Sequence, residues 1–287
     1  MNDQLPMSRR EFTALSLAAG IAAAAGARAA DSREVSDTDV QVKTNSGICD
    51  AALVHPADRV PYPAVIMFPD AFGLRPTMRD MAKQLAQEGY TVLVPNPYYR
   101  LAKAPGLPPG FDFNNPADRQ KLAALRAPLT SDAVMQDAKA YVTYLDSQAT
   151  VKRAAKVGVV GYCMGGPMTL QAAAAMPSRV GAGASFHGGG LVTDKPDSPH
   201  LLARKIKARY YFGIAANDNA REPDAKIRLR EAFGNAGLVA KIEVYEGCLH
   251  GWCIKDMPLA DGKPIYNEAQ AERAWNELVA LFKRAAV

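Results

Sequence analysis

A cysteine stands at the centre of a glycine-rich turn in the segment GYCMGG, residues 161–166. A valine-rich run precedes this segment and an alanine-rich run follows it, so the sequence predicts a strand, a sharp turn and a helix. Gly161 and Gly165 leave room for a turn that holds Cys163 in a strained conformation at a helix N-terminus, where thiolate is favoured over thiol. This context is typical of a nucleophile elbow, although a small buried cysteine in a tight turn fits the segment equally well.

A thiol nucleophile needs a base, and the base needs an acid that orients it. Asp218 follows the apolar run RYYFGI, and His250 follows the run KIEVYE. In a strand-turn-helix fold with such an elbow, the acid and then the histidine come after the nucleophile, each at the end of a strand. The order Cys163, Asp218, His250 therefore predicts a catalytic triad. Asp224 is the nearest alternative acid, and a turn-forming aspartate and a solvated loop histidine are the non-catalytic interpretations.

These residues lie at the ends of segments that alternate between two kinds. Short apolar runs rich in Val, Ile, Tyr or Ala are typical of strands buried on both faces, and they span residues 62–68, 90–95, 155–161, 180–188, 208–214 and 240–246. Stretches of helical period span residues 77–88, 131–147, 223–235 and 267–284. This alternation predicts an α/β fold, with a mostly parallel sheet that helices cover on both faces.

Two further segments complete the expected architecture. Residues 40–56 predict an antiparallel strand pair before the parallel strands. Residues 96–128, rich in proline and glycine, lack a clear period, and we expect them to fold over the carboxyl edge of the sheet, where ligands bind in such folds. No internal repeat or linker indicates a second domain, although the length also allows two small ones.

The composition is that of an ordinary globular protein, with 48% hydrophobic and 22% charged residues among 287. The net charge of +5 is spread along the chain. Proteins that bind nucleic acid instead gather lysine and arginine in blocks, often between aromatic residues. We therefore expect no nucleic-acid partner.

The first 29 residues are predicted to be an export signal that resembles the twin-arginine type. Arg9 and Arg10 precede a weakly apolar, alanine-rich run, which ends in the small-x-small pattern at residues 27–29. That run is short for a hydrocarbon core of about 30 Å, which disfavours a membrane anchor. We expect one mature domain, residues 30–287, to work as a monomer in the periplasm or outside the cell, away from the membrane.

Three segments, GYCMGG, YFGIAANDN and YEGCLHGW, together resemble the dienelactone hydrolase family of the α/β-hydrolase fold. The resemblance covers essentially the whole mature chain. It implies hydrolysis of carboxylic esters or lactones, such as carboxymethylenebutenolide, through a thioester acyl-enzyme and without a metal or organic cofactor. It also implies that Cys163 is the nucleophile, His250 the general base and acid, and Asp218 the orienter of His250.

The resemblance assigns two further roles near the nucleophile. The backbone N–H groups of Met164 and Ala71 are expected to form the oxyanion hole, where each donor typically contributes a few kcal/mol. Asp70 stands where the family usually has a glutamate that pairs with the resting cysteine. Because aspartate is one methylene shorter, the contact with Cys163 depends on the local geometry.

Substrate contacts agree less well with the resemblance. Two arginines hold the substrate carboxylate in the family, and Arg100 is expected to be the first. The second position holds Ile254, and the adjacent Lys255 offers a point charge without the bidentate fork. A general short-chain carboxylesterase that acts on an extracellular ester is therefore the main alternative, and a non-catalytic binding protein on the same fold remains a second one.

The surroundings of His250 leave several interpretations open. Trp252 is expected to form a wall of the site, and His187 either faces the pocket or is a structural loop residue. Cys248 and Cys253 flank His250 and either form a disulfide or line the pocket. A metal site is disfavoured because two cysteines and one histidine lack a fourth ligand. A thiol-redox protein is disfavoured because the chain has no Cys-x-x-Cys motif.

Overall fold

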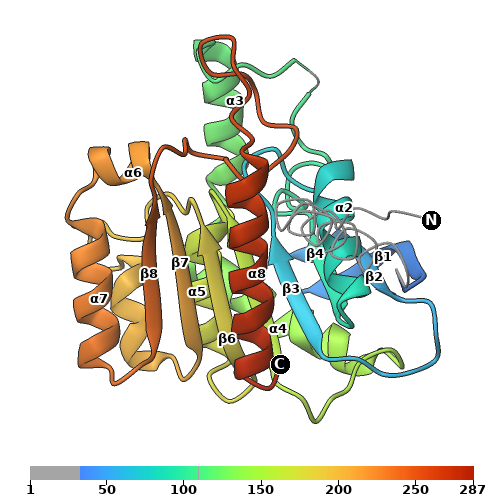
Figure 1. Ribbon diagram of the computed structural model, residues 1–287. Helices are drawn as coiled ribbons and strands as arrows, with labels where there is room; N and C mark the ends of the chain where they lie inside the picture. Colours follow the sequence, from blue (N-terminus) through green and yellow to red (C-terminus); the bar gives the residue numbers. More distant parts are fainter. Residues whose placement is uncertain (1–32, 109) are drawn as a thin grey trace, which may run out of the picture.

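The computed structural model describes residues 33–108 and 110–287, so the predicted export signal lies outside the described residues. The described chain forms one eight-stranded sheet with helices on both faces (Figure 1). The strands follow the order β1-β2-β4-β3-β5-β6-β7-β8. They are β1 (Val35–Thr44), β2 (Gly47–Pro56), β3 (Ala64–Phe68), β4 (Thr91–Pro95), β5 (Val157–Tyr162), β6 (Val180–Phe186), β7 (Arg209–Ala215) and β8 (Ala240–Tyr245).

The pairing of the strands confirms the predicted α/β class. Strands β1 and β2 form the expected antiparallel hairpin, and β2 pairs antiparallel with β4. All other neighbours, from β4 across to β8, pair in parallel. Each predicted apolar run overlaps one of the strands β3 to β8. The carboxyl ends of these parallel strands therefore meet at one edge of the sheet.

The helices divide into two layers. Helices α2 and α8 cover one face of the sheet, and α4, α5 and α7 cover the other. The helical elements are α2 (Pro76–Gln87), α3 (Pro116–Arg126), α4 (Ser131–Ser147), α5 (Gly165–Ala175), the 3-10 helix η1 (Pro199–Lys205), α6 (Ala216–Arg221), α7 (Ala225–Asn235) and α8 (Glu268–Arg284). No helix in residues 33–108 and 110–287 is long and apolar enough to cross a membrane.

Strand β3 is buried on both of its faces. Val65 and Met67 pack on the side of α2 and α8, whereas Ile66 packs on the opposite side. All three side chains are fully buried. Burial of a side chain of this size stabilises the fold by roughly 1.5–3 kcal/mol relative to exposure. The continuous apolar run of β3 is therefore explained by two apolar layers, one on each face.

The segment of residues 96–128 contains a helix that the periodicity did not predict. Helix α3 stands above the edge of the sheet at which the parallel strands end (Figure 1). Leu122 is its single buried residue, so the helix carries no apolar stripe for a sequence pattern to reveal. Its first turn is nevertheless capped, because the Asn115 side chain accepts a hydrogen bond from the Ala117 N–H. The expectation that this segment covers the carboxyl edge agrees with its position.

Candidate active site

Cys163 sits in a sharp turn between β5 and α5, with a positive φ of 50°. Its N–H donates to the Phe186 carbonyl, and its own carbonyl accepts from Gly166 and Gly189. Backbone hydrogen bonds thus hold a conformation that non-glycine residues rarely adopt. A Cβ atom at Gly161 would overlap the Gly165 carbonyl group. The turn therefore requires this glycine and agrees with the predicted elbow geometry.

Two residues of α6, which follows β7 directly, hold the imidazole and the backbone of His250. Its Nδ1 atom lies 2.7 Å from Oδ2 of Asp218, and its backbone N–H donates to Oδ1 of Asn217 at 2.9 Å. Burial opposes protonation, but the hydrogen bond to Asp218 and the adjacent Cys163 sulfur outweigh it and raise the pKa of His250 to about 10. The structure thus brings Cys163, His250 and Asp218 together.

Two further charged residues, Arg221 and Asp224, lie near Asp218 in the chain. Arg221 donates to the remaining oxygen of Asp218 at 2.6 Å, so both carboxylate oxygens are engaged. Asp224, the alternative acid, lies at the N-cap of α7, and within the described residues its side chain makes no hydrogen bond to His250. Sequence reasoning did not find Asn217 or Arg221, although Asn217 directly precedes Asp218 in the chain.

Two backbone N–H groups, one in the elbow and one in the loop after β3, lack hydrogen-bond partners among the described residues. The N–H groups of Ala71 and Met164 donate no hydrogen bond to any part of the chain that the structure describes. A Cβ atom at Gly165 would overlap the Phe68 carbonyl, so this glycine lets the elbow lie directly against the end of β3. The Tyr98 hydroxyl donates to the Ala71 carbonyl at 2.7 Å and fixes that peptide plane. Two free donors at adjacent turns can stabilise a developing oxyanion.

Asp70 does not contact the sulfur of Cys163 as the resemblance implied. Its two oxygens accept hydrogen bonds from Nη1 and Nη2 of Arg75, at 2.7 and 3.0 Å, and Oδ1 also accepts from the Phe72 N–H at 2.9 Å. Burial raises the pKa of Asp70, while the Arg75 guanidinium opposes that rise. The short side chain reaches this arginine, which lies five residues along the chain and which the sequence analysis did not single out.

Arg100, which is expected to hold a substrate carboxylate, is paired with a carboxylate of the protein itself. Its guanidinium donates to both oxygens of Asp137, at 2.8 and 2.9 Å, and stacks over the Tyr99 ring. Both charged side chains are largely buried. Ile254 is buried, and Lys255 lies over the Tyr266 ring. Arg100 and Ile254 thus offer no free cation, and Lys255 lines a groove together with Tyr162 and Cys253.

Arg126, at the end of α3, is the basic residue near the elbow that the sequence analysis missed. It lines a hollow of about 370 Å³ together with Met164, Met168 and Gln171. The guanidinium is exposed and forms no ion pair with any described residue. Its charge opposes the rise in the pKa of Tyr98 that burial causes. Arg126 can therefore attract an anionic group beside the free Met164 N–H.

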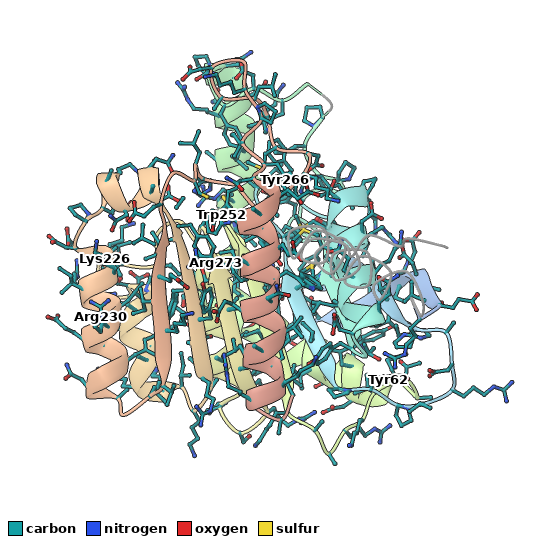
Figure 2. The ribbon with its side chains drawn as sticks, viewed as in Figure 1. Tyr62, Lys226, Arg230, Trp252, Tyr266 and Arg273 are labelled. Carbon is teal, nitrogen blue, oxygen red and sulfur yellow. The ribbon has the colours of Figure 1, made fainter. Side chains whose placement is uncertain are left out.

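His187 and Trp252 form an aromatic wall next to His250. The His187 ring centroid lies 4.9 Å from that of His250 and 5.4 Å from that of Trp252. Trp252 also stacks on Tyr245 and lies near the upper part of α8 (Figure 2). Burial and the adjacent His250 lower the pKa of His187 well below its usual value. A neutral His187 ring thus packs against His250.

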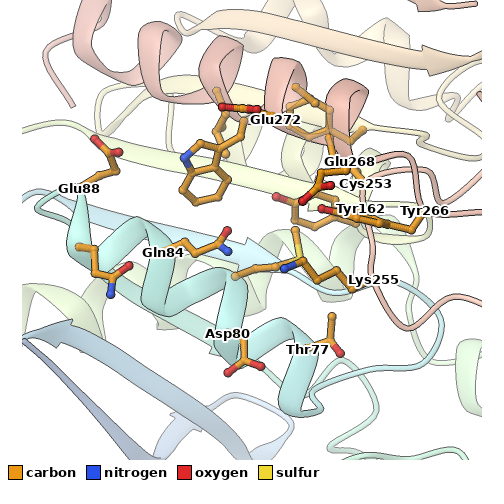
Figure 3. A pocket seen from close by; sticks show the side chains of 17 residues that line it. Thr77, Asp80, Gln84, Glu88, Tyr162, Cys253, Lys255, Tyr266, Glu268 and Glu272 are labelled. Carbon is orange, nitrogen blue, oxygen red and sulfur yellow. The ribbon is translucent and has the colours of Figure 1, made fainter. Parts of the chain in front are cut away.

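A second, larger hollow is lined by Tyr162, the residue that directly precedes Cys163. This groove of about 720 Å³ runs between α2 and α8, and Tyr162 and Cys253 line it (Figure 3). Neither Cys163 nor His250 lines this groove. On the other side of the site, Phe72 packs edge to face against Phe111 and Phe113, at centroid distances of 6.0 and 5.4 Å. The segment of residues 96–128 thus contributes to the surroundings of the free N–H groups.

All four cysteines belong to the described residues and are free thiols. Burial raises the pKa of Cys49 to about 12, which keeps this thiol protonated. Cys248 is buried and Cys253 is partly buried, and the two are not joined by a disulfide. Among the residues that the structure describes, no three His, Cys, Asp or Glu side chains form a group that could hold a metal ion.

Comparison with known proteins gives a consistent result. Residues 49–286 match the model of the dienelactone hydrolase family. A relative from Methylorubrum extorquens, named "Putative carboxymethylenebutenolidase", is 28% identical over 296 aligned positions that cover 99% of this chain and 95% of the relative. A relative of the same name from Synechocystis is 28% identical over 225 positions, which cover 77% and 86% of the two chains.

Solved structures extend the likeness to the fold. The crystal structure of a "Putative Dienelactone Hydrolase" from Klebsiella pneumoniae superposes with a TM-score of 0.73 and 22% identity, covering 88% of this chain and 99% of that one. At such an identity the likeness shows the fold alone. The eight-stranded, mostly parallel sheet with helices on both faces is therefore an α/β-hydrolase fold like that of the dienelactone hydrolases.

Proposed function

Because the chain belongs to the dienelactone hydrolase family, it is a hydrolase of esters or lactones, and we propose that Cys163 is its nucleophile. The observation that carries this proposal is the hydrogen bond between His250 and Asp218 beside a strained cysteine. The raised pKa of His250 favours an imidazolium, which stabilises a neighbouring thiolate. A thiolate at the N-terminus of α5 is a ready nucleophile for a carbonyl carbon.

The reaction proceeds in two steps. The Cys163 thiolate attacks the carbonyl carbon, and the Ala71 and Met164 N–H groups stabilise the oxyanion that forms. His250 then protonates the leaving alkoxide, which in a lactone stays tethered to the acyl group. In the second step His250 takes a proton from water, the resulting hydroxide attacks the thioester carbonyl, and the C–S bond breaks to release the acid and restore the Cys163 thiolate beside protonated His250. A thiolate leaves more readily than an amine, so the site favours esters and lactones over amides.

The substrate class follows from the charges near the elbow. We propose a small ester or lactone that carries a carboxylate, with Arg126 as the residue that attracts this group. The second candidate is a general short-chain carboxylesterase, and the pairing of Arg100 with Asp137 favours it. The two candidates differ in whether a negative charge on the substrate raises kcat/KM.

A comparison of two substrates tests both the nucleophile and the class. The purified protein and its Cys163→Ala variant are assayed under reducing conditions on p-nitrophenyl acetate and on dienelactone, with product release followed over time. We expect turnover by the natural sequence and loss of at least about 10³-fold in the variant, because the covalent step disappears. Unchanged turnover in the variant would rule out Cys163 as nucleophile. No turnover by the unaltered protein would favour a binding protein on the same fold.

We also propose that residues 1–29 direct export by the twin-arginine route, which places the enzyme in the periplasm or outside the cell. The first described strand begins at Val35, so cleavage after Ala29 would remove no described element. Expression in a bacterium with this route should yield a periplasmic protein that starts near Ala30, by intact mass. Replacing Arg9 and Arg10 by lysine should leave the longer chain in the cytoplasm. Processing that is unaffected by this replacement would contradict the proposed route.

A further inference from the structure

One guanidinium joins the two loops that carry the reacting groups on either side of the elbow. Arg75, at the N-cap of α2, donates from Nη1 and Nη2 to Asp70 at 2.7 and 3.0 Å. From Nε and Nη2 it donates to the two oxygens of Asp256, both at 2.7 Å. Asp70 lies in the loop after β3, and Asp256 lies in the loop between β8 and α8, which also carries His250. Arg75 is therefore a bridge between both loops.

The bridge fixes the peptide that carries one oxyanion donor. Asp70 directly precedes Ala71, and its side chain accepts from the Phe72 N–H while its carbonyl accepts from the Gly73 N–H. Hydrogen bonds to Asp70, which Arg75 holds in place, thus fix the loop around Ala71. Tyr98 holds the Ala71 carbonyl from the other side. A displacement of about 1 Å at such a donor is enough to weaken catalysis substantially.

The same bridge sets the charge beside the nucleophile. The Asp70 side chain is 2% exposed and the Arg75 side chain is 10% exposed, so water screens their charges weakly. An uncompensated carboxylate here would disfavour a thiolate at the neighbouring elbow. The Asp256 side chain is 41% exposed, and solvent screens its charge more strongly. Arg75 therefore compensates the negative charge of Asp70, the buried carboxylate next to Ala71.

We propose that Arg75 is a positioning residue of the reaction, which aligns the Ala71 N–H with the elbow and neutralises Asp70 beside the Cys163 thiolate. The alignment rests on the proposed function. The charge effect concerns the thiol alone and is measurable without a substrate. His250, with Asp218 behind it, and Tyr98 are the titratable groups that interact with the Cys163 sulfur. Around them lie His187 next to His250, Arg126 and Asp70 next to Tyr98, and Cys253 next to Asp70, with Arg75 and Asp256 completing the group.

The charge effect is tested by alkylation of Cys163 with iodoacetamide between pH 5 and 10, with the modified peptide identified by mass spectrometry. In Arg75→Gln we expect the pH midpoint of alkylation to rise by about one unit, because Asp70 loses its counter-charge. The double variant Asp70→Asn with Arg75→Gln should return the midpoint to its original value. Arg228 on α7 forms an ion pair with the exposed Asp194, and Arg228→Gln is the matched control, which should not change the midpoint.

The alignment is tested by ester hydrolysis. We expect kcat to fall about 10- to 100-fold in Arg75→Gln, with KM nearly unchanged, and the double variant should recover only part of this loss. Arg75→Lys keeps the charge but cannot bridge two carboxylates with four hydrogen bonds. It should therefore keep the alkylation midpoint and lose kcat, and it serves as the test if Arg75→Gln does not fold.

The outcomes separate this proposal from the proposed function. An unchanged alkylation midpoint in folded Arg75→Gln, or a raised midpoint that persists in the double variant, would overturn the charge effect. An unchanged kcat in both Arg75 variants would overturn the alignment. Failure of the unaltered protein to hydrolyse any ester would instead contradict the proposed function, whereas the alkylation result would still stand.

Discussion

The imidazoles of His187 and His250 pack edge to face, with ring centroids 4.9 Å apart and ring planes at 66°. Both nitrogens of His187 are buried and lack a hydrogen-bond partner within the described residues. The same is true of the Trp252 Nε1 atom. A neutral, buried ring thus lies against one whose pKa is raised, so the pKa values of the two histidines are shifted in opposite directions.

The first prediction concerns the acid stability of the fold. The pKa of His187 is lowered in the folded state, so below about pH 6.5 the unfolded chain binds a proton that the folded chain does not. His187 should therefore lower the free energy of unfolding by up to about 1.4 kcal/mol for each further pH unit of acidification. His187→Phe should lose less stability between pH 7 and 5, as measured by urea unfolding. Equal pH slopes for the two proteins would contradict this prediction.

Removal of the acid that orients His250 should lower activity and change its pH dependence. In Asp218→Asn we expect kcat to fall about 10²- to 10⁴-fold, because the imidazole loses its orientation and its charge compensation. The high pKa of His250 predicts that kcat/KM of the unaltered protein declines only as the pH rises through about 10. In the variant this alkaline limb should move to lower pH. Asp224→Asn is the matched control and should leave both quantities unchanged.

The close approach of the elbow to β3 predicts a glycine requirement. In Gly165→Ala the new methyl group would overlap the carbonyls of Phe68 and Pro69. We expect a loss of at least about 2 kcal/mol in the free energy of unfolding, together with loss of ester hydrolysis. Gly234→Ala, on the exposed side of α7 with nothing near the added atom, should keep activity and gain up to about 1 kcal/mol. Thermal and urea unfolding measure both changes.

The charge beside Met164 predicts a selective effect on anionic substrates. In Arg126→Gln we expect kcat/KM to fall about 10- to 100-fold for dienelactone and to stay within twofold for p-nitrophenyl acetate, because the acetate ester carries no carboxylate. Lys121→Gln on the same helix, which removes only a surface pair with Asp118, should change neither value. An equal loss on both substrates would show that Arg126 does not select for charge.

The sequence predicted the sheet well because its strands are local features. The runs at residues 64–68 and 157–162 are apolar throughout because both faces of each strand are covered. Such continuous apolar runs can be recognised in the sequence alone. Helix α4 was predicted with its observed bounds because its apolar residues recur at helical spacing. Helix α3 was not predicted because Leu122 is its single buried residue, so the sequence shows no apolar stripe. Its stability depends on its N-cap and on packing against the rest of the protein.

The positions of the three proposed triad residues could be predicted from their order along the chain. Cys163, Asp218 and His250 each follow a strand, and parallel strands bring their carboxyl ends together. Their roles as a triad stay a prediction until turnover is measured. The charge pairs were not predictable in the same way. Whether Arg100 faces a substrate or Asp137, and whether Asp70 faces a thiol or Arg75, depends on tertiary distances that residue types do not encode.

The segment of residues 105–128, as far as the structure describes it, arches over the site but supplies neither a triad residue nor an oxyanion donor. Its ends are anchored independently of its interior, since Tyr98 holds Ala71 before it and Thr130 caps α4 after it. With Arg126 in its proposed role, the residue that selects the substrate and the residues that react with it belong to separate segments of the chain. Replacing this segment with its counterpart from a relative should therefore change substrate preference and keep the triad, provided that Phe111 and Phe113, which pack against Phe72 beside Ala71, are retained.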